Sequence, residues 1–253
     1  MKILLALPAF NEENDLPKLL EAFEQQMEAS HYRFQVVIVD DGSTDGTLNV
    51  IREWSSKIPI DVLQHARNSG LGETIQDALY RSAELAEPED IVVTMDADNT
   101  HSPTSIPAMV NAIQKGSDVV IASRYRRGSR VVGLGMFRHL MSYGARLLFQ
   151  IAFPIEGVRD YTCGFRAYRA SLLQKAFARH GRTLAQERGF AAMAEILLTM
   201  RTMNPKFDEI PMVLRYDFKS GGSKMRVGAT VMKTLRMMRR LRSTPSRLTV
   251  TFP

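Results

Sequence analysis

Two aspartates separated by one residue, Asp96 and Asp98, follow an apolar run at 91–95 with the sequence Ile-Val-Val-Thr-Met. The run is rich in β-branched residues, which predicts a buried strand that ends where the aspartates begin. Ser102 and Pro103 are typical of a helix N-cap and first helical position, so the pair stands in a short connection between a strand and a helix. In an open α/β sheet, ligands bind at the edge that such connections form.

Two carboxylates this close repel each other unless a cation lies between them. Their hard oxygen atoms suit Mg²⁺ or Mn²⁺, and a diphosphate would complete the coordination shell. The spacing of Asp96 and Asp98 therefore predicts a site for a divalent cation and a diphosphate. The alternative is that Asp96 caps a turn while Asp98 is solvated, and for an isolated Asp-x-Asp the two interpretations have equal weight.

The first half of the chain alternates apolar strands with amphipathic helices. Strands are expected at 2–7, 34–39, 60–64, 91–95 and 118–122, and helices at 16–27, 47–54, 75–83 and 103–114. This alternation predicts an α/β fold with a Rossmann-like, mostly parallel sheet and helices on both faces.

Three of these strands end in polar turns, at 8–12 (Pro-Ala-Phe-Asn-Glu), 40–41 (Asp-Asp) and 96–98 (Asp-Ala-Asp). Parallel strands bring their carboxyl ends to one edge, which favours a single nucleotide pocket over three unrelated turns. Glu12 could accept a hydrogen bond from a ribose hydroxyl and Asp41 from a base N–H. Gly70 and Gly72 would let the backbone approach a ligand at a helix N-terminus.

Composition limits the classes of protein. The 253 residues, 45% of them hydrophobic and 24% charged, fit a single globular domain. No apolar run approaches the ~18 residues of a membrane-spanning helix, and the run 3–7 is better explained as a first strand than as a secretory signal. Cys163, the single cysteine, has no internal disulfide partner, which fits a cytoplasmic protein.

The chain carries 33 basic and 27 acidic residues, a net charge of +6, which favours an anionic partner. Basic residues concentrate at 124–138 and 219–247. The interleaved aromatic and basic residues of single-strand nucleic-acid binders are absent, so a lipid headgroup or a phosphorylated substrate is favoured over nucleic acid.

The second half of the chain differs in character. A basic loop at 123–128 precedes a segment at 133–157 that is rich in Met, Leu, Phe and Ala, with a helix expected from Phe137. A turn and short strand are expected at 158–168, a helix at 190–200 and a strand at 207–214. The last helix carries Val227, Val231, Leu235, Met238 and Leu241 on one stripe among basic residues, which suits an anionic membrane surface. Core packing with a solvated basic face is an equally weighted alternative, and 243–253 is expected to be a tail.

Several motifs occur in the order seen in one enzyme family. They are Pro8–Glu12, Val39–Thr47, Asn68–Gly72, Asp96–Asp98, Ser123–Tyr125, Asp160–Arg166 and Gly221–Lys224. Over residues 2 to 230 the chain resembles the family 2 glycosyltransferases, most closely their dolichol-phosphate (polyprenyl-phosphate) mannose synthase branch. The resemblance implies one GT-A domain at 1–242, with a nucleotide-sugar-binding half at about 1–125 and an acceptor-side half at about 126–242.

The resemblance also implies roles for individual residues. Those expected to bind the nucleotide sugar are Pro8, Ala9, Phe10, Glu12, Val39, Asp41, Gly70, Asp96, Ala97, Asp98, Arg124 and Lys224. Those expected to bind Mg²⁺ or Mn²⁺ are Asp96, Asp98 and Thr100. The family commonly has Gln at the position of Thr100, so His101 or water are alternatives for the third ligand. A family Arg falls on Phe218, and Arg215 or Lys219 could replace it.

The implied reaction is an inverting transfer of a sugar from GDP-mannose or a UDP-hexose to a polyprenyl or dolichyl phosphate. Asp98, Arg124, Asp160 and Lys224 are the expected catalytic residues. A phosphate acceptor is already anionic and needs no general base. A hydroxyl acceptor does need one, and Asp160, Glu187 and Glu195 are the candidates.

The alternative function is a soluble glycosyltransferase that acts on a hydroxyl of a small molecule or natural product. A sugar nucleotidyltransferase would need a glycine-rich loop after the first strand, which this chain lacks, and a non-catalytic module would be expected to have lost the Asp-x-Asp pair. For the leading function we expect a cytoplasmic protein, peripheral on the inner face of a membrane. Its oligomeric state stays open.

Overall fold

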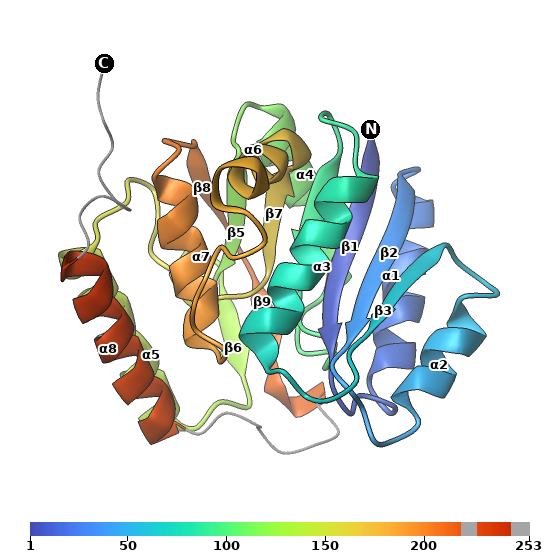
Figure 1. The fold of residues 1–253 in the computed structure, drawn as a ribbon, viewed down its shortest axis with the longest axis horizontal. Coiled ribbons are helices and arrows are strands. Elements are labelled where there is room, and N and C mark those ends of the chain that lie inside the picture. The colour runs from blue at the N-terminus through green and yellow to red at the C-terminus, as the bar shows by residue number, and fades with distance from the viewer. Residues whose placement is uncertain (219–226, 244–253) are drawn as a thin grey trace.

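The computed structural model describes residues 1–218 and 227–243 and contains a central sheet of seven strands (Figure 1). The strands are β1 (Lys2–Ala9), β2 (Arg33–Asp40), β3 (Ile60–Gln64), β4 (Ile91–Thr94), β5 (Val119–Ser123), β7 (Arg166–Arg169) and β8 (Phe207–Pro211). Their order is β3-β2-β1-β4-β7-β5-β8, and only β7 runs antiparallel to its neighbours. The mostly parallel α/β sheet predicted from the alternation is therefore confirmed.

Helices cover both faces of this sheet. They are α1 (Leu16–Ala29), α2 (Thr47–Trp54), α3 (Leu71–Leu85), α4 (Ile106–Gln114), α5 (Met136–Ala152), α6 (Ala170–His180), α7 (Ala191–Arg201) and α8 (Val227–Ser243). In Figure 1, α3, α6 and α7 lie on the near face and α1 and α4 on the far face, while α5 and α8 stand at the end of the molecule farthest from β3. Among the described residues, none of these helices combines the length and apolarity needed to cross a bilayer.

Strands β1, β2, β4 and β5 form where the apolar runs predict them, because parallel strands covered on both faces need side chains that are apolar on both sides. Their central residues, such as Leu5, Val37, Val93 and Val120, are fully buried. The strand expected at 207–214 is split at Met212. Its second part, β9 (Val213–Arg215), leaves the main sheet to pair with β6 (Arg130–Val132). The helix expected at 103–114 begins as a 3₁₀ turn at 103–105, capped by Ser102, before α4 starts.

A buried carboxylate on α7 ties α8 to the body of the protein. Glu195, only 2% exposed, accepts hydrogen bonds from the backbone amides of Gln186 and Glu187, both at 3.0 Å. Its other oxygen accepts one from Arg240 of α8 at 2.7 Å, and Arg240 also lies 3.4 Å from the Glu187 carboxylate. The residue thus joins α7 to the segment that precedes it, at 186–187, and to α8, 45 positions away.

We predict that Glu195→Ala lowers the free energy of unfolding by about 2–4 kcal/mol, because it leaves two amides without their acceptor and removes one of the two carboxylates paired with Arg240. Arg240→Ala should cost only about 1 kcal/mol, since its side chain is 36% exposed and the amide bonds remain. Urea unfolding of both variants measures the difference. Equal losses, or none for Glu195→Ala, would contradict the role assigned to Glu195.

Candidate active site

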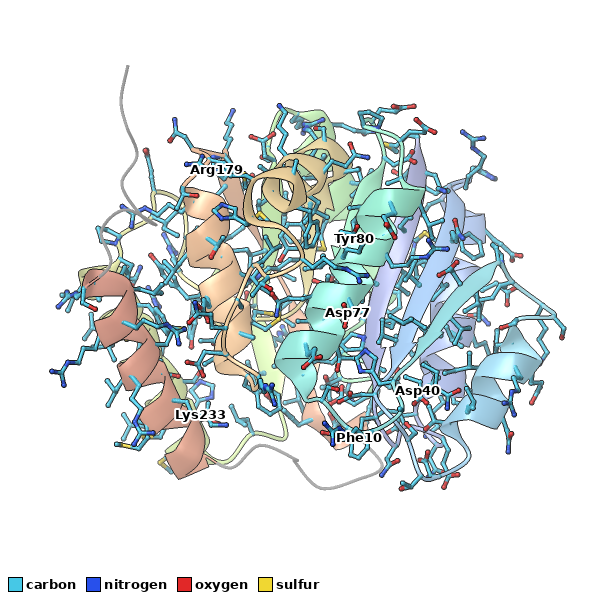
Figure 2. All side chains as sticks on the ribbon, viewed as in Figure 1. Phe10, Asp40, Asp77, Tyr80, Arg179 and Lys233 are labelled. Atoms are coloured by element: carbon cyan, nitrogen blue, oxygen red, sulfur yellow. The ribbon has the colours of Figure 1, made fainter. Side chains whose placement is uncertain are left out.

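The carboxyl ends of β1, β2, β4 and β5 lie on one edge of the sheet because these strands are parallel. β7 is antiparallel, so the chain that enters it, at 158–165, arrives at the same edge. Figure 2 shows Phe10 and Asp40 at this edge, the lower one in the view. The three polar turns predicted to share an edge therefore do so, and they are joined by Arg124 after β5 and Asp160 before β7.

The connection after β4 holds the Asp-x-Asp pair in a tight turn. Asp96 and Asp98 are partly exposed, whereas Thr100 is buried. Thr100 donates two hydrogen bonds to Asp98 Oδ1, from its hydroxyl at 2.6 Å and from its amide at 3.2 Å. His101 accepts the amide of Asp96 through Nδ1 at 3.3 Å and packs against Phe165. Thr100 and His101 thus fix the conformation of the turn, and their role as a third metal ligand stays a prediction.

The donor chemistry of this turn fits a hard divalent cation. Mg²⁺ is commonly held by one or two carboxylates together with phosphate and water oxygens, and two partly exposed aspartates meet that need. Within residues 1–218 and 227–243 no cluster of three or more His, Cys, Asp or Glu side chains has metal-binding spacing. Gly164 lies against the pair, since a Cβ there would come within 3.4 Å of Asp96 Oδ1.

Arg124, which is partly exposed, forms an ion pair with the fully buried Asp160 beside this turn. Asp160 Oδ2 accepts the Nε of Arg124 at 2.8 Å and its amide at 3.0 Å, and Oδ1 accepts Nη2 at 2.6 Å. The same Nη2 donates to Thr162 Oγ1 at 2.6 Å, and Cys163 donates its amide to Asp160 at 3.1 Å. This bidentate geometry fixes the plane of the guanidinium group.

The pair also sets the protonation of its members. Burial raises the pKa of Asp160, but the charge and hydrogen bonds of Arg124 outweigh it and hold that pKa below its usual value. Burial likewise lowers the pKa of Arg124, yet Asp160 keeps it well above the usual value. A carboxylate held ionised by so many donors is a weak proton acceptor. The geometry therefore favours Asp160 as the residue that orients Arg124 rather than as the general base considered for a hydroxyl acceptor.

Asp41 organises the loop that follows β3. Its carboxylate accepts the amides of Ser69 at 2.8 Å and Gly70 at 2.9 Å, and His65 Nδ1 lies 2.8 Å from Oδ1. A Cβ on Gly70 would lie 2.7 Å from the carbonyl of Arg188, and one on Gly72 would clash with the carbonyl of Glu187. Both glycines thus allow the close approach of the chain's own 187–188 segment. Contact of Gly70 and Asp41 with a nucleotide remains a prediction.

Hydrogen bonds join the turn after β1 to the loop after β2. Asn11 donates its amide to Ser43 Oγ at 2.9 Å and accepts the amide of Thr44 at 2.8 Å. Glu12 donates its amide to Thr47 Oγ1 at 2.8 Å. Of the other predicted nucleotide-binding residues, Pro8, Ala9, Val39 and Ala97 are buried, whereas Phe10 is partly exposed at the edge. Their contact with a ligand also stays a prediction.

The remaining residues expected to contact phosphate lie near the end of the chain. Lys224, the Gly-Gly-Ser-Lys motif and Lys219 lie outside the described residues. Arg215, considered as a replacement for the family Arg, binds Asp217 through two hydrogen bonds and lies over the ring of Phe218. Tyr216, which sequence reasoning missed, lies near the acidic turn, since Arg215 donates its amide to the carbonyl of Thr100 at 3.0 Å. Burial raises the pKa of its phenol.

A cavity of about 170 Å³ opens beside Arg124. Its lining residues are Arg124, Tyr125, Arg126, Val131, Leu134, His139, Ser142 and Tyr143. Tyr125 contacts Ser142 Oγ at 2.6 Å, which holds the first half of α5 against the basic loop. The arrangement combines cationic and apolar side chains, as a site for an amphipathic anion would require.

Comparison with known proteins finds similar sequences and a similar fold. The sequence is 32% identical over 242 residues to a dolichol-phosphate mannosyltransferase of Pyrococcus furiosus, covering 95% of this chain and 64% of that protein. It is 26% identical over 239 residues to a polyprenol monophosphomannose synthase of Mycolicibacterium smegmatis, covering 92% of this chain and 84% of that protein. The chain thus spans somewhat less than two thirds of the Pyrococcus relative.

A solved structure with a similar fold is glucosyl-3-phosphoglycerate synthase from Mycobacterium tuberculosis, in complex with Mn²⁺, uridine diphosphate and glucosyl-3-phosphoglycerate. The two share a TM-score of 0.62 and 20% identity over 98% of this chain and 80% of that one, which confirms the expected GT-A fold. The family whose description is "Glycosyl transferase family 2" matches residues 5–177, well over half of the chain. The chain therefore belongs to glycosyl transferase family 2.

Proposed function

We propose that the protein transfers a sugar, with inversion, from a nucleotide-diphosphate sugar to a polyprenyl phosphate. The observation that carries this proposal is the Arg124–Asp160 pair. It holds the guanidinium group of Arg124 in one orientation, at the same sheet edge as Asp96 and Asp98. A diphosphate bound at the acidic turn would then lie near a fixed positive charge. The names of the Pyrococcus and Mycolicibacterium relatives support this donor and acceptor class.

The donor would occupy the edge formed by β1, β2 and β4. The turns at 8–12 and 40–47 would hold the nucleoside of GDP-mannose or a UDP-hexose, and Asp96 and Asp98 would hold Mg²⁺ or Mn²⁺. Such a cation, when bound, neutralises charge on the diphosphate oxygens. Lys224 would meet the same phosphates and add a second positive charge to that of Arg124. On this view, residues 1–125 bind the donor and residues 126–242 bind the acceptor.

A phosphate acceptor fits the state of the candidate bases better than a hydroxyl does. Asp160 is paired with Arg124, and Glu187 and Glu195 are both paired with Arg240. None of the three carboxylates is therefore well suited to take a proton from a hydroxyl, whereas a phosphate monoester attacks without losing one. The cavity beside Arg124 would receive the acceptor headgroup.

In the reaction, an oxygen of the acceptor phosphate forms a bond to the anomeric carbon while the bond from that carbon to the donor diphosphate breaks. Negative charge moves to the leaving diphosphate, and no proton is transferred. Arg124 would stabilise that charge, and because Asp160 fixes its guanidinium in advance, little reorganisation is needed as the charge develops.

The lipid tail of such an acceptor lies in a membrane, so the protein needs a surface that binds the membrane. The exposed face of α5 is our candidate. Its exposed apolar side chains, each exposed between 40% and 88%, are Met136, Leu140, Tyr143, Leu147, Leu148 and Ile151. On α8, Met232 and Leu235 are exposed, together with the basic Lys233, Arg236 and Arg239. An apolar patch beside basic residues suits an anionic leaflet, here the inner face of the membrane.

We predict that the protein forms a radiolabelled glycolipid from labelled GDP-mannose or a UDP-hexose only when undecaprenyl or dolichyl phosphate and a divalent cation are present. Chromatography of the organic phase measures the product. Chelation with EDTA should abolish its formation. A water-soluble glycoside made without any lipid phosphate would instead support the alternative hydroxyl acceptor.

Arg124→Lys should reduce kcat about a hundredfold, because a lysine cannot reproduce the bidentate contact with Asp160 or its fixed direction. Arg127→Lys is the matched control: it alters an exposed arginine of the same loop and should change kcat by less than about twofold. Steady-state kinetics at saturating donor compares the two. Similar kcat values for both variants would remove Arg124 from the reaction.

For the membrane surface, the double variant Leu140→Glu, Leu147→Glu should weaken binding to vesicles containing phosphatidylglycerol by at least about tenfold, since two apolar side chains lose their burial in lipid. The control is Val62→Glu, Leu63→Glu, which changes two exposed apolar residues on β3 at the opposite end of the molecule. Vesicle co-sedimentation measures both. If the two double variants bind alike, α5 is not the docking face.

A further inference from the structure

Glu209, a residue that neither the motifs nor the proposed reaction uses, lies buried in the edge strand β8 and is only 4% exposed. Its Oε1 accepts two consecutive backbone amides, Arg159 at 2.6 Å and Asp160 at 2.7 Å. Oε2 has no hydrogen-bond partner among the described residues, and the Nε of Arg126 lies 4.0 Å away. One carboxylate oxygen of Glu209 thus fixes the backbone amides of Arg159 and Asp160.

The contact of Glu209 continues directly to the reacting edge. Asp160, fully buried, receives the Glu209 bond on its amide and uses its own carboxylate to hold Arg124. Both links are short, and both connect residues distant in sequence, 49 and 36 positions apart. The position of the guanidinium group of Arg124 therefore depends on β8, a strand that lies beyond β5 at the end of the sheet.

Burying a carboxylate at this position costs free energy, so its presence indicates a specific role. Burial raises the pKa of Glu209, and the nearby Asp160 charge adds to that increase. The two buried carboxylates, Glu209 and Asp160, oppose each other electrostatically. A purely structural strand position would be served at lower cost by an apolar side chain, so the two amide bonds are the specific contribution of Glu209.

We propose that Glu209 is a positioning residue, which through the 159–160 backbone and Asp160 holds Arg124 facing the phosphates of the reaction. This inference rests on the proposed function in assigning the phosphates to Arg124. Glu209 itself touches neither substrate. Its loss should therefore reduce the rate of the chemical step while leaving donor binding at β1, β2 and β4 intact.

The kinetic test compares Glu209→Ala, Glu209→Gln and Asp90→Ala. Asp90 is the matched control, a buried carboxylate that accepts the amides of Lys2 and Glu87 at the opposite edge of the sheet. Glu209→Ala should lower kcat about tenfold to a hundredfold, with the donor KM changed by less than about twofold. Glu209→Gln keeps an amide oxygen for both bonds and should recover most of the rate. Asp90→Ala should lower the melting temperature but not kcat.

A second readout does not depend on any reaction. The Nε–H of Arg124 donates to Asp160, so it should give a slowly exchanging signal in an ¹⁵N–¹H NMR spectrum, assigned by its absence in Arg124→Lys. The signal should persist in Glu209→Gln and Asp90→Ala and be lost in Glu209→Ala. If Glu209→Ala does not fold, Glu209→Asp, whose shorter side chain withdraws from both amides, should lose the signal in its place.

Unchanged Arg124 exchange in the folded Glu209→Ala or Glu209→Asp variant would overturn the proposal. An equal loss of kcat in Asp90→Ala would also overturn it, because the lower kcat would then follow from the lower stability of the protein. If the wild-type protein transfers no sugar to a lipid phosphate but the NMR result holds, the proposed function fails while the positioning role of Glu209 stands.

Discussion

The ion pair between Arg124 and the buried Asp160 is the interaction on which the candidate site depends. It joins the end of β5 to the segment that enters β7, and it forms because β7 is antiparallel and lies between β4 and β5. A parallel strand in that place would bring its entering segment to the opposite edge. Because β7 is antiparallel, the carboxylate of Asp160 lies at the same edge as the polar turns that follow the parallel strands. There it fixes the guanidinium group of Arg124 near Asp96 and Asp98.

Carboxylates have two different roles at this edge of the sheet and around it. Asp41, Glu195 and Glu209 are buried and hold backbone amides, which fixes the loops after β3, before α7 and before β7. Asp96 and Asp98 are partly exposed at the surface of the edge, where a cation and a diphosphate can reach them. Because the loops are held by buried groups, the exposed pair and Arg124 keep a fixed relation without a ligand, as electrostatic preorganisation requires.

The sequence predicts the first half of this architecture well because its signals are local. Apolar runs identify β1 to β5, and the residue types after them identify the polar turns. The contacts of Asp160, Glu209 and Gly70 could not be predicted, since their partners lie many positions away and no local pattern names them. The short strand β6 was missed for the same reason, because its partner β9 is distant in sequence. The helix α6 was missed although Leu172, Leu173, Ala176 and Phe177 give it a local helical pattern. Gly70 admits the chain's own backbone at Arg188, and its contact with a ligand stays a prediction.

The most direct test of the central claim is a crystal structure of the protein with Mn²⁺ and a nucleoside diphosphate, measured at a wavelength where manganese scatters anomalously. If the charged edge gathers the donor, an anomalous peak should lie at the Asp98 carboxylate, with the diphosphate between it and the guanidinium of Arg124. Manganese or nucleotide bound elsewhere, with this edge empty, would contradict the claim.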